Sequence, residues 1–238
     1  GISIGREITT NIEITTKKDK PGIDIFVKPG TKGESVHIPV ILTATGLKDL
    51  VYNDFFIGEG AEVKIIAGCG IHNGGKEESQ HDGIHSFHIG RNARVSYIEK
   101  HYGEGEEKGG RVMNPTTIVE IEEGGYMEMD TVQIKGVTDT KRTTKASLHD
   151  RATLIIREKI MTSGKETAET DFTVDLNGED SSANVVSRSV AKEDSHQIFR
   201  SRINGNNRCN GHTECDAIIM NDASVSAIPE ITANNVEA

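Results

Sequence analysis

The chain has 238 residues, a net charge of −10, no Trp, four Tyr and six Phe. It contains 28 Ile and 16 Val but only six Leu, and β-branched residues favour strands, which excludes a helix bundle and a coiled coil and argues against a Rossmann-type domain. An acidic chain without a dense basic run is also a poor general nucleic-acid binder, so no nucleic-acid partner is predicted.

Residues 1–50 open the chain with short alternating stretches such as Ile12-Glu13-Ile14, but they lack the repeat that follows. We expect this segment to form an irregular N-terminal cap or flanking strands, and residues 51–238 to form one β-helix core. The most helix-like segments, 46–52 and 190–199, are short and carry no sustained 3.6-residue apolar stripe. No stretch approaches the roughly 20 apolar residues of a transmembrane helix, so no membrane span is predicted.

From residue 51 onwards a turn pair, a small residue, a variable residue and an apolar residue recur, first as Glu59-Gly60-Ala61-Glu62-Val63. The small residue returns at positions 61, 93, 125, 152, 183 and 223. A period of about 32 residues is typical of solenoids and propellers, and the near absence of aromatic residues disfavours a propeller. Stacked coils bury a narrow core in which Ile and Val form ladders. The sequence therefore predicts an all-β parallel β-helix, with a β-sandwich as the alternative.

A first group of metal-ligating residues lies in the N-terminal half of the repeat region. It comprises Cys69, His72, His81, His85, His88 and His101. Cysteine and histidine are standard zinc and iron ligands, so these residues are a candidate mononuclear metal site. The spacing does not decide the matter, because residues 85 and 88 point to opposite faces of a strand. The other interpretation is a set of structural or surface histidines on a β-solenoid.

A second group lies in the run from Cys209 to Asp216, which also contains His212, Glu214 and Cys215. On one extended strand the two sulfurs are roughly 20 Å apart and cannot share an ion, unless Asn210-Gly211 folds the chain back. Alternation puts Cys215 on one face and His212 and Glu214 on the other. An accessible Cys215 thiol could bind a soft metal or carry sulfur, whereas a buried one would only fill space.

Two familiar catalytic motifs are incomplete. The Ser163-Gly164-Lys165 segment has no Ser or Thr after the lysine, so the chain itself is not expected to bind ATP, and no nucleophile elbow is present. Three cysteines form no even disulfide framework, which fits a reducing cytoplasm.

Several separate blocks resemble the SufB/SufD family of iron–sulfur cluster assembly proteins, over roughly residues 54–238. These blocks are residues 81–87, 99–103, 113–117, 129–136, 183–189, 211–219 and 227–231. The resemblance implies a right-handed parallel β-helix that acts as a scaffold rather than as an enzyme. It implies a SufC-type ABC ATPase as partner, and a dimer with itself or with a SufB/SufD-like protein through the C-terminal end of the β-helix.

Cys215-Asp216 occupies the place of the family's cluster or sulfur cysteine, so the resemblance makes Cys215 the expected ligand of a transient iron–sulfur cluster. Cys209, His212 and Glu214 are weaker candidates beside it. Two alternatives stay open. One is a mononuclear metal-binding module built on Cys69, His72, His81, His85 and His88, and the other is a β-helix enzyme that acts on polysaccharides.

Overall fold

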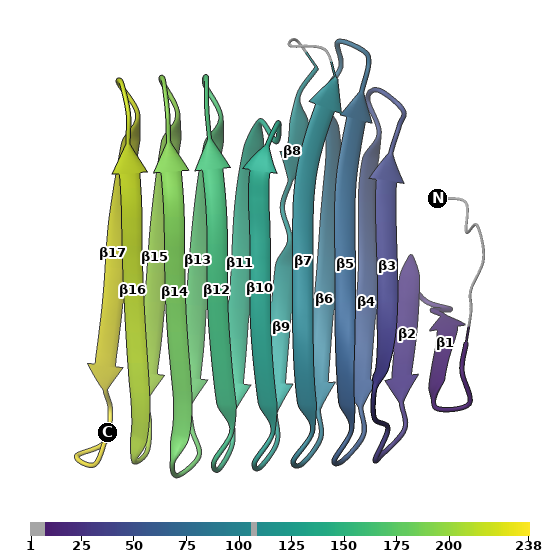
Figure 1. The fold of residues 1–238 in the computed structure, drawn as a ribbon, viewed down its shortest axis with the longest axis vertical. Coiled ribbons are helices and arrows are strands. Elements are labelled where there is room, and N and C mark those ends of the chain that lie inside the picture. The colour runs from purple at the N-terminus through teal and green to yellow at the C-terminus, as the bar shows by residue number, and fades with distance from the viewer. Residues whose placement is uncertain (1–7, 106–108) are drawn as a thin grey trace.

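A computed structural model describes residues 8–105 and 109–238, and within these ranges every regular element is a strand. The strands form two sheets that face each other (Figure 1). The front sheet, nearer the viewer, contains β3 (Glu34–Leu42), β5 (Glu62–Asn73), β7 (Arg94–Gly105), β10 (Tyr126–Lys135), β12 (Thr153–Thr162), β14 (Ser181–Ala191) and β16 (Cys209–Ile219). The back sheet contains β1 (Ile12–Thr16), β2 (Gly22–Val27), β4 (Lys48–Ile57), β6 (Ser79–Ile89), β8 (Arg111–Met113), β9 (Thr116–Ile121), β11 (Asp139–Leu148), β13 (Thr167–Leu176), β15 (His196–Gly205) and β17 (Ser224–Ala233).

The chain alternates between the two sheets and stacks into a parallel β-solenoid of about seven turns. In Figure 1 the front strands run upward, the back strands run downward, and the coil advances from right to left, which makes it right-handed. The predicted β-helix is thus confirmed. The described residues contain no helix long and apolar enough to cross a lipid bilayer.

Parallel stacking begins before residue 51. Strand β2 pairs in parallel with β4 and β3 pairs in parallel with β5, whereas β1 pairs antiparallel with β2. Only β1 therefore departs from the coil pattern among the described residues of the expected cap, and residues 1–7 lie outside the described ranges. The two helix-like segments are not helical: residues 48–52 are the start of β4, and residues 190–199 comprise the end of β14, a turn at 192–195 and the start of β15.

The tight turns at the lower rim of Figure 1, where back strands lead into front strands, explain the sequence repeat. Ala93 closes such a turn by donating its backbone N–H to the carbonyl of Gly90. Ala61, one coil earlier, and Ala152, two coils later, close their turns in the same way. The residue before the alanine takes a left-handed backbone, as Asn92 does with φ of 55°. Each small side chain is buried, so a larger one would collide with the packed interior.

Two of the six predicted repeat positions, 183 and 223, do not lie in a lower-rim turn. In the fifth coil Ser181, not Ala183, closes the turn, and Ala183 pairs with Leu154 inside the strand. Ala223 belongs to the opposite, upper rim, where its counterpart in the preceding coil is Ser195. The upper-rim turns of the late coils also contain a left-handed residue, but it lies two positions before the small residue, as Glu193 does before Ser195, whereas at the lower rim it lies directly before it.

A ladder of asparagines stabilises the lower rim of the last coils. The Asn206 side chain donates to Asn177 Oδ1 at 2.7 Å and accepts from Asn234 Nδ2 at 2.8 Å. We expect Asn206→Ala to lower the free energy of unfolding by about 1–2 kcal/mol, because two hydrogen bonds are lost. Denaturant unfolding measures this change. Asn210→Ala, at an exposed position of β16, is the control, and equal midpoints for the two variants would contradict the role of the ladder.

The interior is divided along its length. Near the lower rim it is apolar, with Phe55 stacked on Phe87 at 4.3 Å between ring centroids and with ladders of Ile, Leu and Val beside them. Towards the upper rim, buried histidine, glutamate, arginine, threonine and serine side chains replace them. Burying such groups costs free energy unless they are paired, so this half of the interior is where a functional site is to be sought.

Candidate functional site

A row of inward-facing polar residues runs through five adjacent strands of the front sheet and ends at a cysteine. The in-register pairs join, in order, Glu99, Thr131, Glu158, Ser187 and Cys215. The first four are at most 3% exposed, while Cys215, on the last strand of the sheet, is half-buried. We call these five residues the polar row.

Arg142, which projects inward from β11 of the back sheet, contacts both carboxylates of the polar row. Its guanidinium is hydrogen-bonded to Glu99 and lies 3.8 Å from Glu158 Oε1. Burial opposes ionisation of Glu99, but the charges of Arg142 and His101 outweigh it and hold the pKa of Glu99 well below its usual range. Glu158 also accepts hydrogen bonds from Thr170 at 2.9 Å and from Ser187 at 2.7 Å.

At its N-terminal end the polar row meets a hydrogen-bonded chain that starts at Tyr97 of the front sheet and continues to His85 and Asn53 of the back sheet. Tyr97 donates to Glu99 Oε1 at 3.0 Å, His85 Nδ1 lies 2.8 Å from the Tyr97 hydroxyl, and Asn53 lies 3.3 Å from His85 Nε2. His101 Nε2 is 3.6 Å from Glu99. Burial lowers the pKa of His85 to about 4, so this imidazole is neutral at pH 7. The neutral ring and the ionised Glu99 together form an ordered network.

The first predicted group of ligands converges in part. Cys69, His81 and His85 line one interior gap with His101, whereas His72 and His88 are exposed on the outer faces. Burial raises the pKa of the Cys69 thiol. His81 Nδ1 lies 2.9 Å from Asp49, and its Nε2 is buried without a hydrogen-bond partner among the described residues. No three ligand atoms around this gap come within 4.8 Å of one another in the described part of the chain, so the residues are close but do not form a ready metal site.

The second predicted group lies on β16, which runs without a turn from Cys209 to Ile219. The hypothesis that Asn210-Gly211 folds the chain back is therefore wrong, and the two cysteines do not share a site. Cys209 pairs with Ser181 and Cys215 with Ser187, so both thiols face inward. His212 and Glu214 face outward, where Arg188 Nη2 lies 3.4 Å from Glu214 Oε1.

Cys215 thus differs from its neighbours on β16 by its connection to the polar row. Burial raises the pKa of its thiol, and the charges of Glu158 and Asp216 raise it further. The thiol is consequently protonated at neutral pH, and a metal ion that binds the sulfur has to displace this proton. Binding of a soft cation at Cys215 is expected to strengthen as the pH rises.

The sequence analysis did not identify Glu99, Arg142 or Glu158. The alternation of inward and outward residues along a strand could have identified Glu99 and Glu158. Val95 and Tyr97 set the inward parity of β7, and the same period of two places Glu99 inside. Leu154 and Ile156 place Glu158 inside in the same way. A charged residue at an inward position of a strand is therefore the feature to look for in such a repeat.

Comparison with known proteins adds independent information. Residues 51–238 match the family model described as "SUF system FeS cluster assembly, SufBD core domain". A protein of Archaeoglobus fulgidus named "Iron-sulfur cluster assembly SufBD family protein" is 28% identical over 232 residues, which cover 94% of this chain and 61% of that protein. A protein of Methanocaldococcus jannaschii with the same family name is 26% identical over 217 residues, 90% of this chain and 67% of that protein. The chain therefore spans about three fifths to two thirds of the length of these relatives.

Proposed function

The chain belongs to the SufBD family of iron–sulfur cluster assembly proteins, and from this premise we propose that it is a scaffold on which a nascent cluster, or the sulfur for it, is held by Cys215. The observation that carries the proposal is the position of this thiol. It ends a buried polar row, it is half-buried rather than sealed, and it lies on the last strand of the front sheet. Cys209, His212 and Glu214 are neighbours on the same strand, and none of them lies on the polar row.

In this proposal the protein supplies a ligand and has no catalytic activity of its own. The cluster is cargo, and ATP hydrolysis belongs to a separate SufC-type partner. The three cysteines are all free thiols, in keeping with work in a reducing cytoplasm.

The proposed contact with a second subunit, either another copy or a SufB/SufD-like partner, is the end of the solenoid formed by β16 and β17. Ile219 and Ile231 continue inward rows of the two sheets, yet they are 51% and 57% exposed. A partner that covers them would bury apolar surface and would bring its own side chains towards Cys215. This arrangement would complete a ligand set that β16 alone does not provide.

Anaerobic reconstitution of the chain with ferrous iron and sulfide tests the proposal. We expect Cys215→Ser to bind several-fold less iron and acid-labile sulfide than the wild type, because serine oxygen is a poor ligand for an iron–sulfur cluster. Cys209→Ser is the matched control, since it removes an inward thiol from the same strand without touching the polar row. Equal cluster content in wild type and Cys215→Ser, or loss only in Cys209→Ser, would remove Cys215 from the site.

A further inference from the structure

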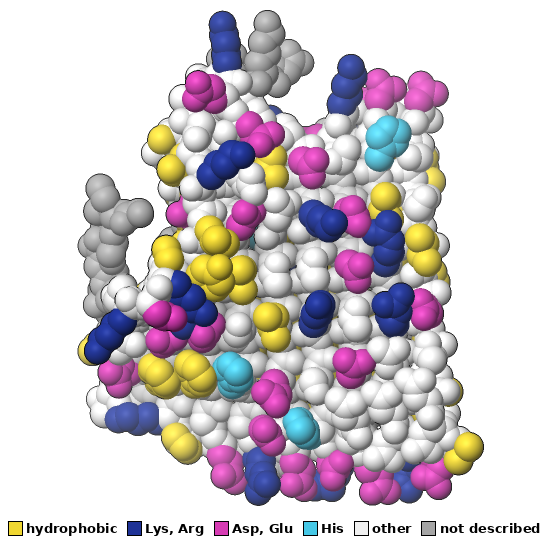
Figure 2. Space-filling model, turned by 180° about the vertical axis from the view of Figure 1, so that it is seen from behind, with side chains coloured by type: hydrophobic (Ala, Val, Ile, Leu, Met, Phe, Trp, Pro, Cys, Tyr) yellow, Lys and Arg dark blue, Asp and Glu magenta, His cyan; other side chains and the backbone are white. Residues whose placement is uncertain are grey.

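A groove of about 460 Å³ lies on the outer surface, away from the polar row. It follows the back sheet close to the lower rim, where Figure 2 shows histidine and acidic side chains among hydrophobic ones. Phe26, Phe56 and His88 form one wall, with stacked rings whose successive centroids are 4.9 Å apart. Gly58 and Gly90 also line the groove.

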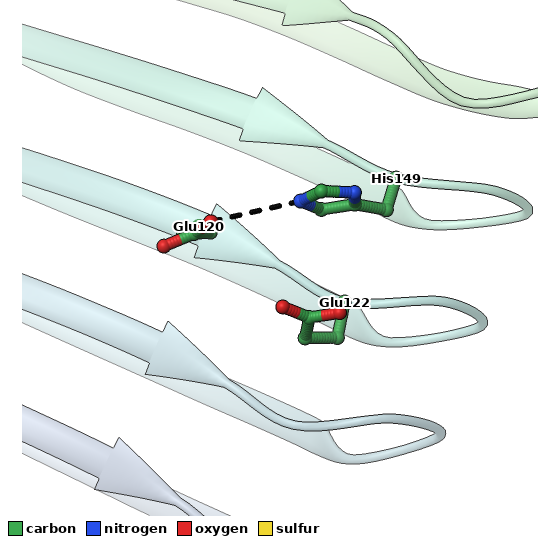
Figure 3. A group of neighbouring side chains, drawn as sticks. All are labelled: Glu120, Glu122 and His149. Atoms are coloured by element: carbon green, nitrogen blue, oxygen red, sulfur yellow. Dashed lines mark ion pairs between the residues drawn. The ribbon is translucent and has the colours of Figure 1, made fainter.

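The aromatic wall ends at a glutamate, and this glutamate lies between two histidines. Glu120 is the in-register neighbour of His88, and its Oε2 is 3.7 Å from His88 Nδ1. Its other oxygen, Oε1, is 3.6 Å from Nε2 of His149 (Figure 3). Both separations exceed the length of a hydrogen bond. They are close to the spacing of about 3.3 Å between two donors of one tetrahedral ion with bonds of about 2.0–2.1 Å.

Glu122 completes the group. It follows β9 directly, as His149 follows β11, and each donates its backbone N–H to the residue that ends the preceding back strand. The two side chains therefore sit one above the other at the lower rim (Figure 3). One ligand atom from each of Glu120, Glu122 and His149 can be chosen so that all three lie within 4.8 Å of one another. We call these three residues the rim cluster.

The surroundings of the rim cluster do not neutralise it. No Lys or Arg nitrogen in the described part of the chain lies within 4.0 Å of the carboxylates of Glu120 or Glu122, although the adjacent Glu123 pairs with Arg91 and Arg151. In the next coils, the positions equivalent to Glu122 and His149 hold Asn177 and Asn206, which bond directly to each other. The rim cluster thus has two carboxylates side by side without a fixed cation and without such a bond.

We propose that the rim cluster binds a divalent transition-metal ion of the ferrous iron, cobalt or zinc class. Imidazole and carboxylate together suit these ions, whereas Mg²⁺ and Ca²⁺ prefer oxygen ligands alone. A divalent cation would neutralise the two carboxylates and draw the three side chains together. Glu120, Glu122 and His88 also line the groove, so an exchangeable ligand could reach the ion from there. The proposal does not depend on the role assigned to Cys215.

Calorimetric titration of the metal-free, reduced chain with Co²⁺ tests the rim cluster. We expect Glu122→Gln and His149→Gln each to weaken one Co²⁺ site at least tenfold, and Glu123→Gln, on the same turn, to leave that site unchanged. Cys215→Ser should also leave it unchanged, which separates it from any cluster site. An anomalous difference map from a crystal soaked in Co²⁺ should place the ion between the three side chains.

The inference is overturned if Glu122→Gln and His149→Gln bind Co²⁺ as tightly as the wild type. It is also overturned if the anomalous map places no ion at the rim cluster, or if Cys215→Ser abolishes the same binding event. Circular dichroism of each variant confirms that the solenoid is intact, and both substitutions change partly exposed side chains at a turn.

Discussion

Replacing Arg142 by alanine is expected to lower the free energy of unfolding by about 3–5 kcal/mol, because it leaves two buried carboxylates without their cation. Arg142, Glu99 and Glu158 are each at most 3% exposed, so water cannot take the place of the lost charge. The loss should show as a lower denaturant midpoint. Stacked coils need not unfold in one step, so the midpoint should be followed by two probes that report on different coils.

Arg200→Ala is the matched control, because Arg200 pairs with Glu169 on the outer face of the same sheet with both side chains about one-third exposed. A surface pair of this kind is worth about 1 kcal/mol or less. Converting Arg142 to Met together with Glu99 and Glu158 to Gln should recover much of the stability, since the uncompensated charge is then removed. A cost for Arg142→Ala no greater than that for Arg200→Ala would contradict the paired arrangement.

The second large effect is a loss of stability on acidification. Burial holds the pKa of His85 at about 4 in the folded chain, against an ordinary value of 6.5. Between these values the unfolded chain binds a proton that the folded chain does not, so stability is fully present above pH 6.5 and falls as the pH drops towards 4. The difference in pKa corresponds to about 3 kcal/mol. The pKa of His81 is also lowered by burial, and it acts in the same direction.

Glu99 extends this trend to lower pH. Its pKa is lowered in the folded state, so its contribution is present above the ordinary carboxyl range and is lost as the pH falls through the folded value. Unfolding measured at pH 7 and pH 4.5 should show the drop. His85→Gln, which retains hydrogen-bonding groups for Tyr97 and Asn53, should flatten it, and the exposed His196→Gln should not. Equal stability of the wild type at both pH values would refute the assignment of a neutral buried His85.

The fold could be read from the sequence because a solenoid repeats its turn chemistry, and four of the six predicted repeat positions lie at one rim. The prediction failed at positions 183 and 223 because Ser181 and Cys209 hold the lower-rim position that is alanine in earlier coils, and because Ala223 lies in an upper-rim turn. Cys215 could be predicted as the candidate ligand because of the family resemblance. The network around Arg142 was not, because its partners come from different coils and both sheets, and only the stacking register shows that Glu99 and Glu158 flank one guanidinium.

The two rims of the solenoid differ in how they accommodate changes in chain length. Strands β5 and β7 have 12 residues and β10 and β12 have 10, yet all four start in register at the lower rim. The extra residues therefore project at the upper rim alone. In evolutionary terms, insertions and deletions at the upper rim leave the spacing of the lower turns intact. The in-register alignment of the polar row, which ends at Cys215, is therefore preserved when the chain length at the upper rim changes.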